Sequence, residues 1–318
     1  MAYGSRLSLK RINGNHDARP HAACATATTL VTMARRTALP QRQKLPHGPV
    51  ARARDGVLAH NSAHGPFDVV GDVHGCLDEL LALMTALGYG VTQKDSQFEV
   101  VPPAGRTLVF AGDLVDRGPD CPGVLRLAIS MSRAGQAICV AGNRDVELVK
   151  ALKGRAVQIS LGMARSLDQI KAAPSGFRSE ARRFLDRLAS HHVLDDGKLV
   201  IAHAGLKESL QGKASPEARN IALRGEPTGE KDNYGLPVYL SWASDYQGKA
   251  LVAYGHSPVA EPVWINNTVN LDTGCVYGGH LTALRYPERE TVSVPARAVY
   301  YRARKPFPVN EGIEKTGR

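Results

Sequence analysis

The feature that most constrains the fold is a unit that recurs along the chain. Each unit has a short apolar run followed by a turn that carries an acidic, amide or histidine side chain, usually beside glycine. Five apolar runs end at such a turn, and the turns are Gly71–Gly75, Gly112–Gly118, Gly142–Asp145, Ala202–Ala204 and Tyr254–His256. Short apolar runs bounded by glycine are typical of buried strands. The chain is therefore expected to build sheets whose strand ends carry polar donors.

The segments between these turns indicate the fold class. Strands are expected at residues 67–70, 107–110, 137–140, 199–201, 251–254, 268–271, 281–286 and 292–294. Helices are expected at about 76–87, 121–132 and 146–153, followed by a long helical region that ends at His191 and His192. Strands that alternate with helices early and follow one another late predict an α/β chain of mixed α+β type. We expect a sandwich of two mixed β-sheets flanked by helices.

Six side chains at these strand ends are candidate metal ligands. They are carboxylates, imidazoles and one amide, namely Asp72, His74, Asp113, Asn143, His203 and His256. Ligands of open α/β sheets bind beyond the carboxyl ends of the strands, so these side chains are expected to converge. Oxygen and nitrogen donors without thiolate suit two divalent ions, with Mn²⁺ preferred and Fe, Zn²⁺ or Ni²⁺ as alternatives. Two ions about 3.5–4 Å apart can clamp a phosphate and activate a bridging water, and Asp113 is the candidate bridging carboxylate.

The positive charge of the chain lies mostly in its N-terminal part. The 318 residues carry a formal charge of +10, and residues 1–66 hold ten basic and two acidic side chains. The other residues are nearly neutral, so their charge does not indicate a polyanionic partner. We interpret residues 1–65 as a basic, disordered extension able to make weak nucleic-acid contacts. Residues 66–302 are interpreted as the catalytic domain and residues 303–318 as a polar tail.

Composition also bears on the compartment. No apolar run approaches the roughly 18 residues that a membrane span needs. The five cysteines are scattered and lack Cys-x-x-Cys spacing. Such a pattern is typical of a reducing compartment rather than of a disulfide framework. We therefore expect a cytoplasmic protein without a membrane partner.

The motifs resemble those of a known family. Asp-x-His, Gly-Asp-x-Val-Asp-Arg-Gly, Gly-Asn-x-Asp, a single His and Gly-His follow one another over residues 67–300. Their order is similar to that of the calcineurin-like metallophosphoesterases, within the phosphoprotein-phosphatase branch. The resemblance implies that one metal ion is held by Asp72, His74 and Asp113. It implies that the other is held by Asp113, Asn143, His203 and His256.

One position departs from the family motif. The family has a histidine after Asn143, which protonates the leaving group and is oriented by the acid at Asp116; here the residue is Arg144. The resemblance also makes Arg117 the arginine that grips the phosphate. Arginine does not release a proton at physiological pH, so general-acid catalysis is expected to be impaired. An intact Gly-Asn-His-Asp at Gly14–Asp17 follows no apolar strand, and we interpret it as a coincidence.

A closer likeness lies downstream. Segments 254–258, 266–268, 271–275 and 281–287 resemble the phosphatase module of bacterial polynucleotide kinase-phosphatases. That resemblance implies removal of 2′- or 3′-terminal phosphates from RNA and makes Asp272 a substrate-side or supporting acid. A turn-forming role for Asp272 in Asp-Thr-Gly is equally open. No kinase phosphate loop precedes these segments, and few residues follow Tyr301, so a free-standing phosphatase module is expected.

Together these features predict a dinuclear metal-dependent phosphatase that hydrolyses phosphomonoesters by a metal-bound hydroxide. The favoured partners are polynucleotide 2′/3′ ends (RNA or DNA), and a Ser/Thr phosphoprotein is the alternative. Further alternatives are a symmetrical dinucleoside-tetraphosphate hydrolase and a non-catalytic metal- and phosphate-binding pseudo-enzyme. Aromatic side chains between His203 and His256 could stack on a base, although packing is the favoured interpretation of Tyr234, Tyr239, Trp242 and Tyr246.

Overall fold

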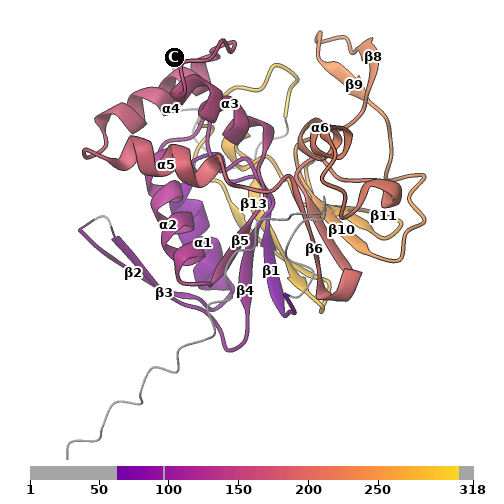
Figure 1. The fold of residues 1–318 in the computed structure, drawn as a ribbon, viewed down its shortest axis with the longest axis horizontal. Helices are drawn as coiled ribbons and strands as arrows, with labels where there is room; N and C mark the ends of the chain where they lie inside the picture. Colours follow the sequence, from indigo (N-terminus) through magenta and orange to yellow (C-terminus); the bar gives the residue numbers. More distant parts are fainter. Residues whose placement is uncertain (1–62, 96, 308–318) are drawn as a thin grey trace, which may run out of the picture. The chain divides into compact units, whose positions relative to one another are not determined.

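The computed structural model describes residues 63–95 and 97–307. Two five-stranded sheets form the centre of this part of the chain (Figure 1). The first has the order β14-β13-β1-β4-β5. Its strands are β1 (Phe67–Val70), β4 (Thr107–Phe110), β5 (Ala137–Cys139), β13 (His280–Tyr286) and β14 (Glu290–Pro295). β1, β4 and β5 run parallel to one another, whereas β13 is antiparallel to both of its neighbours, β1 and β14. The first sheet is therefore mixed.

The second sheet is also mixed and has the order β11-β12-β10-β7-β6. Its strands are β6 (His191–Leu194), β7 (Leu199–Ala202), β10 (Leu251–Tyr254), β11 (Val263–Ile265) and β12 (Thr268–Asn270). The central strand β10 is parallel to β7 and β12, and the two edge strands are antiparallel to their neighbours. The ends of β7 and β10 therefore point in the same direction, which places their following residues together.

The two sheets pack face to face. One buried cluster joins Val69 and Val109 of the first sheet to Ile201, Ala253 and Val269 of the second. Full burial of a side chain of this size stabilises the fold by about 1.5–3 kcal/mol. The next residue of β1, Val70, belongs to a different cluster on the opposite face of the sheet. This alternation follows from the two-residue period of a strand.

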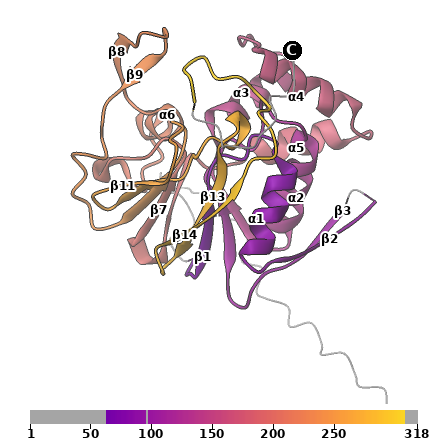
Figure 2. The same cartoon turned by 180° about the vertical axis from the view of Figure 1, so that it is seen from behind.

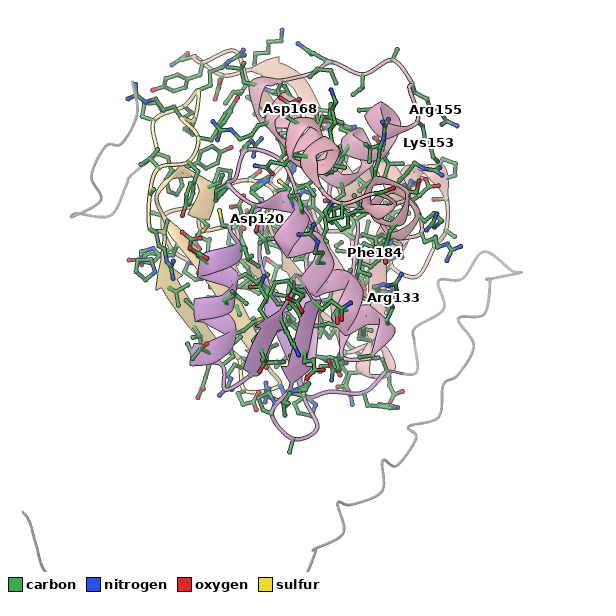
Figure 3. The ribbon with its side chains drawn as sticks, turned by 90° about the vertical axis from the view of Figure 1, so that its left-hand side faces the viewer. Asp120, Arg133, Lys153, Arg155, Asp168 and Phe184 are labelled. Carbon is green, nitrogen blue, oxygen red and sulfur yellow. The ribbon has the colours of Figure 1, made fainter. Side chains whose placement is uncertain are left out.

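Helices cover the outer face of the first sheet (Figures 1 and 2). They are α1 (Leu77–Ala86), α2 (Cys121–Arg133), α3 (Asn143–Leu152), α4 (Leu161–Ala172) and α5 (Phe177–Leu185). The side chain of Asp120 accepts a hydrogen bond from the Gly123 amide and caps α2 on the face drawn in Figure 3. α1, α2 and α3 begin 7, 11 and 4 residues after the ends of β1, β4 and β5, so the turns between them are held at both ends.

The second sheet has a different cover. Its outer face packs against the segment that contains Trp242, Tyr246 and Ala250, and against α6 (Pro216–Arg224). Two hairpins complete the described strands: β2 (Gly90–Lys94) with β3 (Gln97–Val101), and β8 (Pro227–Lys231) with β9 (Pro237–Tyr239). The β8–β9 hairpin extends away from the second sheet (Figure 1). In residues 63–95 and 97–307, no helix is long and apolar enough to cross a membrane.

The predicted fold class is confirmed, with three corrections to individual elements. α3 begins at Asn143 rather than at residue 146, since Asp145 caps its first turn. The single long helical region is two helices, because Pro174 and the left-handed Gly176 separate α4 from α5. His191 and His192 do not end a helix; they pair with β7 as part of β6. The basic extension, apart from residues 63–65, and the Gly14–Asp17 motif lie outside the described residues.

Candidate metal centre

The six predicted ligands converge at the carboxyl ends of five strands. β1, β4 and β5 of the first sheet lead into the segments that carry four of them, and β7 and β10 of the second sheet lead into the other two. Five of the six side chains are buried, and that of His256 is half-buried. The turns that seemed separate in the sequence therefore form a single cluster. Its members are Asp72, His74, Asp113, Asn143, His203 and His256.

The donors fall into two groups that share one carboxylate. In the first group, one donor atom each of Asp72, His74 and Asp113 lies within 4.8 Å of the others. In the second, Asn143 Oδ1 lies 3.1 Å from His203 Nε2 and 3.1 Å from His256 Nδ1. Asp113 Oδ2 is 3.6 Å from His74 Nε2 and 3.5 Å from His203 Nε2, so this one oxygen faces both groups. That is the position of a bridging ligand.

Backbone carbonyls orient two of the imidazoles. His74 Nδ1 donates to Val115 O at 2.8 Å, and His203 Nδ1 donates to Ala111 O at 3.2 Å. Because a carbonyl oxygen can only accept, the proton of each neutral ring sits on Nδ1. The Nε2 lone pair of each ring is then directed into the cluster, as expected for metal-binding histidines.

These contacts fit divalent ions. The Nε2 atom of His203, Oδ1 of Asn143 and Oδ2 of Asp113 all present lone pairs to one another without a proton between them. Ligands about 2.0–2.2 Å from a metal ion stand roughly 3–3.5 Å apart, which is the spacing of these atoms. A cation would replace repulsion between acceptors with coordination. The residues therefore suit two ions that share Asp113.

Burial tunes the protonation of the ligands. It lowers the pKa of both His203 and His256 to about 3, so both rings are neutral near pH 7 and free to coordinate. Burial, followed by the nearby Asp272 and Asp113, raises the pKa of Asp72 well above its usual value. Ionised carboxylates here are costly without a compensating charge. The cluster consequently favours a bound cation over an empty, fully ionised state.

The turns that carry the site adopt unusual backbone conformations. Among non-glycine residues, φ is +47° at His74, +47° at Asp113, +80° at Asp116, +72° at Arg117 and +73° at His256. Side chains with a Cβ rarely occupy this region, and such strain persists where the surrounding structure holds it. This feature could not be read from the sequence, because none of these residue types requires a positive φ.

Two glycines permit the close approach of the ligands. A Cβ at Gly142 would stand 2.0 Å from Asp113 Oδ1, and one at Gly255 would stand 2.0 Å from Asp72 Oδ1. Both positions are closed to any other residue unless a ligand moves. These two glycines are therefore needed because a larger side chain would collide with a carboxylate of the cluster, not because glycine takes part in the chemistry.

Asp145 joins two of the turns, a role that the sequence reading did not assign. Its Oδ1 accepts from the Leu114 amide at 3.0 Å and its Oδ2 accepts from the Gly142 amide at 2.9 Å. The carboxylate thereby connects the turn after β4 to the turn after β5. The acid in the fourth position of Gly-Asn-x-Asp was the available signal for it.

Arg144 lies beside the acid that was predicted to orient this position. Its Nε is 3.4 Å from Asp116 Oδ2, and its Nη1 donates to Glu147 Oε2 at 2.9 Å. The Arg144 amide also donates to Asp113 Oδ1 at 2.9 Å. The guanidinium is thus held at the edge of the metal cluster by two carboxylates, of which Glu147 was not anticipated. No histidine of the described residues takes this place beside Asp116.

Arg117 and Asp272 also lie against the cluster. Arg117 Nη1 donates to His74 Nε2 at 2.9 Å, the lone pair that a metal ion would use, and its guanidinium stacks on Tyr277 at 5.4 Å. Tyr277 was missed because it follows no strand-end motif. Asp272 is buried beside Asp72, and its carboxylate accepts from the Gly274 amide. Burial raises the pKa of Asp272 to about 6.

The aromatic side chains between His203 and His256 separate into two groups. Trp242 packs edge-on against Tyr246 at 5.9 Å and against Tyr254 at 5.1 Å, which agrees with a packing role. Tyr239, at the end of β9, meets the His256 ring edge-on at 5.5 Å and is 36% exposed. Tyr234, at the turn of the same hairpin, is 45% exposed. The hairpin thus presents aromatic surface beside the metal cluster.

A mixed β-sandwich with clustered oxygen and nitrogen donors at its strand ends defines a metal-dependent phosphoesterase. The comparison with known families agrees, since residues 65–290 match the family described as calcineurin-like phosphoesterase. The chain belongs to this family.

Curated relatives align over most of their own length. The asymmetrical bis(5′-nucleosyl)-tetraphosphatase PrpE of Anoxybacillus flavithermus is 44% identical over 74% of this chain and 96% of the relative. PrpE of Bacillus subtilis is 39% identical over 75% of this chain and 98% of the relative. A crystal structure described as a candidate diadenosine tetraphosphatase is 27% identical, with a TM-score of 0.55 over 74% of this chain and 96% of the other. These proteins bear the name of a dinucleoside tetraphosphatase, not that of a polynucleotide kinase-phosphatase.

Proposed function

We propose that this protein hydrolyses bis(5′-nucleosyl) tetraphosphates asymmetrically, releasing a nucleoside triphosphate and a nucleoside monophosphate. The observation that carries the proposal is the set of relatives named for this activity, of which the chain covers 94–96% at 42–44% identity in the first two. The proposal replaces the polynucleotide 2′/3′ end as the favoured substrate. The symmetrical cleavage considered from the sequence becomes the competing outcome.

The chemistry of the site supports a phosphoanhydride substrate. Bound divalent ions would supply a hydroxide nucleophile near neutral pH and would neutralise phosphate charge. The chain provides their ligands, and Arg117 provides a guanidinium fork that suits phosphate oxygens. Arg117 lies against His74, so a phosphate held by this arginine would lie at the metal cluster.

The residue at position 144 favours the same class of substrate. A nucleotide leaving group is a phosphate whose final pKa is about 6, so it departs as an anion without needing a proton. An alcohol leaving group, as in a phosphomonoester, needs a general acid, which Arg144 cannot be. A fixed cation near the departing phosphate stabilises its charge instead. The pairing of Arg144 with Asp116 and Glu147 fixes the guanidinium for that task.

The exposed aromatics fit the nucleoside ends of the substrate. A dinucleoside polyphosphate carries a base on each side of its phosphate bridge, and bases stack on tyrosine rings. Tyr239 lies beside the ligand His256, and the hairpin that carries it leaves its ring part-exposed. We therefore assign the β8–β9 hairpin to contact with one base.

The test is a comparison of substrates on the purified full chain with Mn²⁺. Bis(5′-adenosyl) tetraphosphate, a 3′-phosphorylated oligonucleotide and a phosphoserine peptide are supplied separately, and products are separated by chromatography. ATP and AMP in equal amounts, formed faster than phosphate from the other two substrates, are expected. ADP as the sole nucleotide product would replace the proposal with symmetrical cleavage. Faster release of phosphate from the oligonucleotide or the peptide would replace it with a phosphomonoesterase.

A fourth substrate in the same experiment tests whether the protein is a non-catalytic metal- and phosphate-binding protein. A chromogenic aryl phosphate has a good leaving group and needs neither a base-binding surface nor a general acid. Hydrolysis of it that depends on added metal is expected. Metal binding without hydrolysis of any of the four substrates would make the protein a pseudo-enzyme.

A further inference from the structure

A second group of potential ligands lies outside the metal cluster. Cys76 directly precedes α1, Glu79 lies in its first turn, and Cys275 opens the short helix η3 (Cys275–Tyr277). One ligand atom of each lies within 4.8 Å of the others. The relative exposures of Cys76, Glu79 and Cys275 are 0%, 1% and 1%. Three donors thus meet in a place closed to solvent.

Only one of the two carboxylate oxygens of Glu79 has hydrogen-bond partners among the described residues. Its Oε1 accepts from the Arg297 amide at 2.8 Å and from the Tyr300 hydroxyl at 2.8 Å. Its Oε2 is buried, and among the described residues no group donates to it. A buried carboxylate oxygen without a partner is destabilising. The thiols of Cys76 and Cys275 complete the group of three ligand atoms.

We propose that Cys76, Glu79 and Cys275 form a separate structural site for a thiophilic divalent ion of the zinc class. Sulfur at about 2.3 Å and carboxylate oxygen at about 2.0–2.2 Å from such an ion stand closer together than the 4.8 Å limit met here. Thiolates select zinc-like ions, whereas the oxygen and imidazole donors of the metal cluster suit harder ones. A cation also supplies the partner that Glu79 Oε2 lacks.

The other buried thiols serve as a contrast. Cys121 Sγ lies 3.3 Å from the Ser166 hydroxyl, and Cys139 Sγ lies 3.6 Å from the Ser132 hydroxyl. Each therefore has an ordinary polar neighbour, as Cys76 has in the carbonyl oxygen of His74. Neither belongs to a group of three ligand atoms among the described residues. Burial of a cysteine alone does not distinguish the proposed site; the convergence with an unpaired carboxylate does.

The location gives the site a structural consequence. Cys76 follows the ligand His74 by two residues, and its Sγ is 3.9 Å from the carbonyl oxygen of His74. Cys275 follows Asp272 by three residues. An ion held by both thiols would tie the turn after β1 to the turn after β12 from behind. It would support the metal cluster without touching substrate.

Cobalt spectroscopy on the full chain tests the proposal. The reduced protein is stripped with a chelator and titrated anaerobically with Co²⁺, which gives a sulfur-to-metal charge-transfer band only when thiolate is a ligand. The band is expected in the wild type and in Asp113→Asn, where the metal cluster is disabled. It should weaken in Cys76→Ser and in Cys275→Ser, disappear in the Cys76→Ser/Cys275→Ser double variant, and persist at full strength in the matched control Cys139→Ser.

Two results would overturn the proposal. One is a wild-type protein that binds Co²⁺ without the charge-transfer band. The other is a band that survives in the Cys76→Ser/Cys275→Ser double variant. Because serine variants of buried cysteines can fail to fold, Glu79→Gln gives an independent check. Its amide oxygen can still accept from Arg297 and Tyr300, yet Co²⁺ affinity at the band should fall at least about tenfold, as for loss of even an outer partner of a ligand. An unchanged affinity in Glu79→Gln would also reject the site.

Discussion

The two sheets contribute to the metal centre in different ways. The first supplies both carboxylates that face the ions, and its three donor-bearing turns lead within a few residues into α1, α2 and α3. The second supplies the imidazoles of His203 and His256; the chain after His203 reaches α6 only at Pro216 and then forms the β8–β9 hairpin, and the chain after His256 continues into β11. The carboxylate half is braced by helices, and the imidazole half borders exposed aromatic surface. Both halves therefore carry proposed metal ligands, and the imidazole half also borders the surface that we propose for substrate contact.

The largest effect is expected where the two halves meet. Asp113 Oδ2 faces His74 and His203, so Asp113→Asn should weaken both metal sites together. Hydrolysis of an aryl phosphate should fall by more than about 10³-fold, because water without its metal ions is no longer ionised near neutral pH. Metal content by mass spectrometry and initial rates measure this. Asp196→Asn, an exposed change between β6 and β7, is the control, and full metal content in Asp113→Asn would contradict a shared ligand.

The second prediction tests whether Arg144, on the first-sheet half, faces the leaving group of the substrate. Arg144→His places a proton donor beside Asp116 and should raise turnover of an alkyl phosphate by about 10²–10⁴-fold. Turnover of a dinucleoside tetraphosphate should change much less, because its leaving group departs as an anion. Arg144→Lys keeps the charge and should give no gain. If Arg144→His leaves the alkyl phosphate rate unchanged, the assignment of position 144 is wrong.

The third prediction concerns the second-sheet half alone. Tyr239→Ala should raise KM for a dinucleoside tetraphosphate about 5- to 150-fold, which corresponds to a stacking contribution of about 1–3 kcal/mol per base. KM for an aryl phosphate should stay the same, and Tyr239→Phe should behave like the wild type. Equal losses on both substrates would show that Tyr239 supports His256 rather than a base.

The smallest effect is expected from pH. In the metal-free fold, burial raises the pKa of Asp72 and Asp113 above their unfolded values, so these carboxylates favour folding at low pH and oppose it as pH rises through the folded pKa. Bound metal reverses this, since it requires the ionised form. A fixed Mn²⁺ concentration that is 100 times its Kd at pH 8 should stabilise the fold by about 2.7 kcal/mol at that pH. The increase in Tm should be larger at pH 8 than at pH 5; an equal increase would exclude proton competition.

The difference between the halves also explains what the sequence could predict of the fold. Strands β1, β4 and β10 were placed correctly, because each is a short, mostly apolar and mostly buried run with glycine nearby. The β8–β9 hairpin was missed, since its residues are largely exposed and carry no hydrophobic period. β6 was read as a helix end because His191 and His192 look like capping residues. Only pairing with β7 buries them in a sheet.

The candidate site likewise has a part that the sequence could predict and a part that it could not. The convergence of the six proposed ligands could be predicted, because each lies within four residues of the end of its strand and strand ends meet in space. The contacts of Tyr239 with His256 and of Tyr277 with Arg117 join segments far apart in sequence, and no local pattern encodes them. Glu147 was missed for a related reason: in the sequence, an acid three residues from an arginine looks like an ordinary surface pair of a helix, whereas both side chains are half-buried.

The bonds from Asp145 to the amides of Leu114 and Gly142 hold two donor-bearing turns together through protein groups alone. Most of the conformational entropy of these turns is therefore lost on folding, not on ion capture. Metal uptake becomes the docking of an ion into a preformed cage, so apparent affinity should approach the intrinsic affinity of the ligands. Amide hydrogens of Leu114 and Gly142 should accordingly exchange slowly with solvent deuterium even in chelator-treated protein.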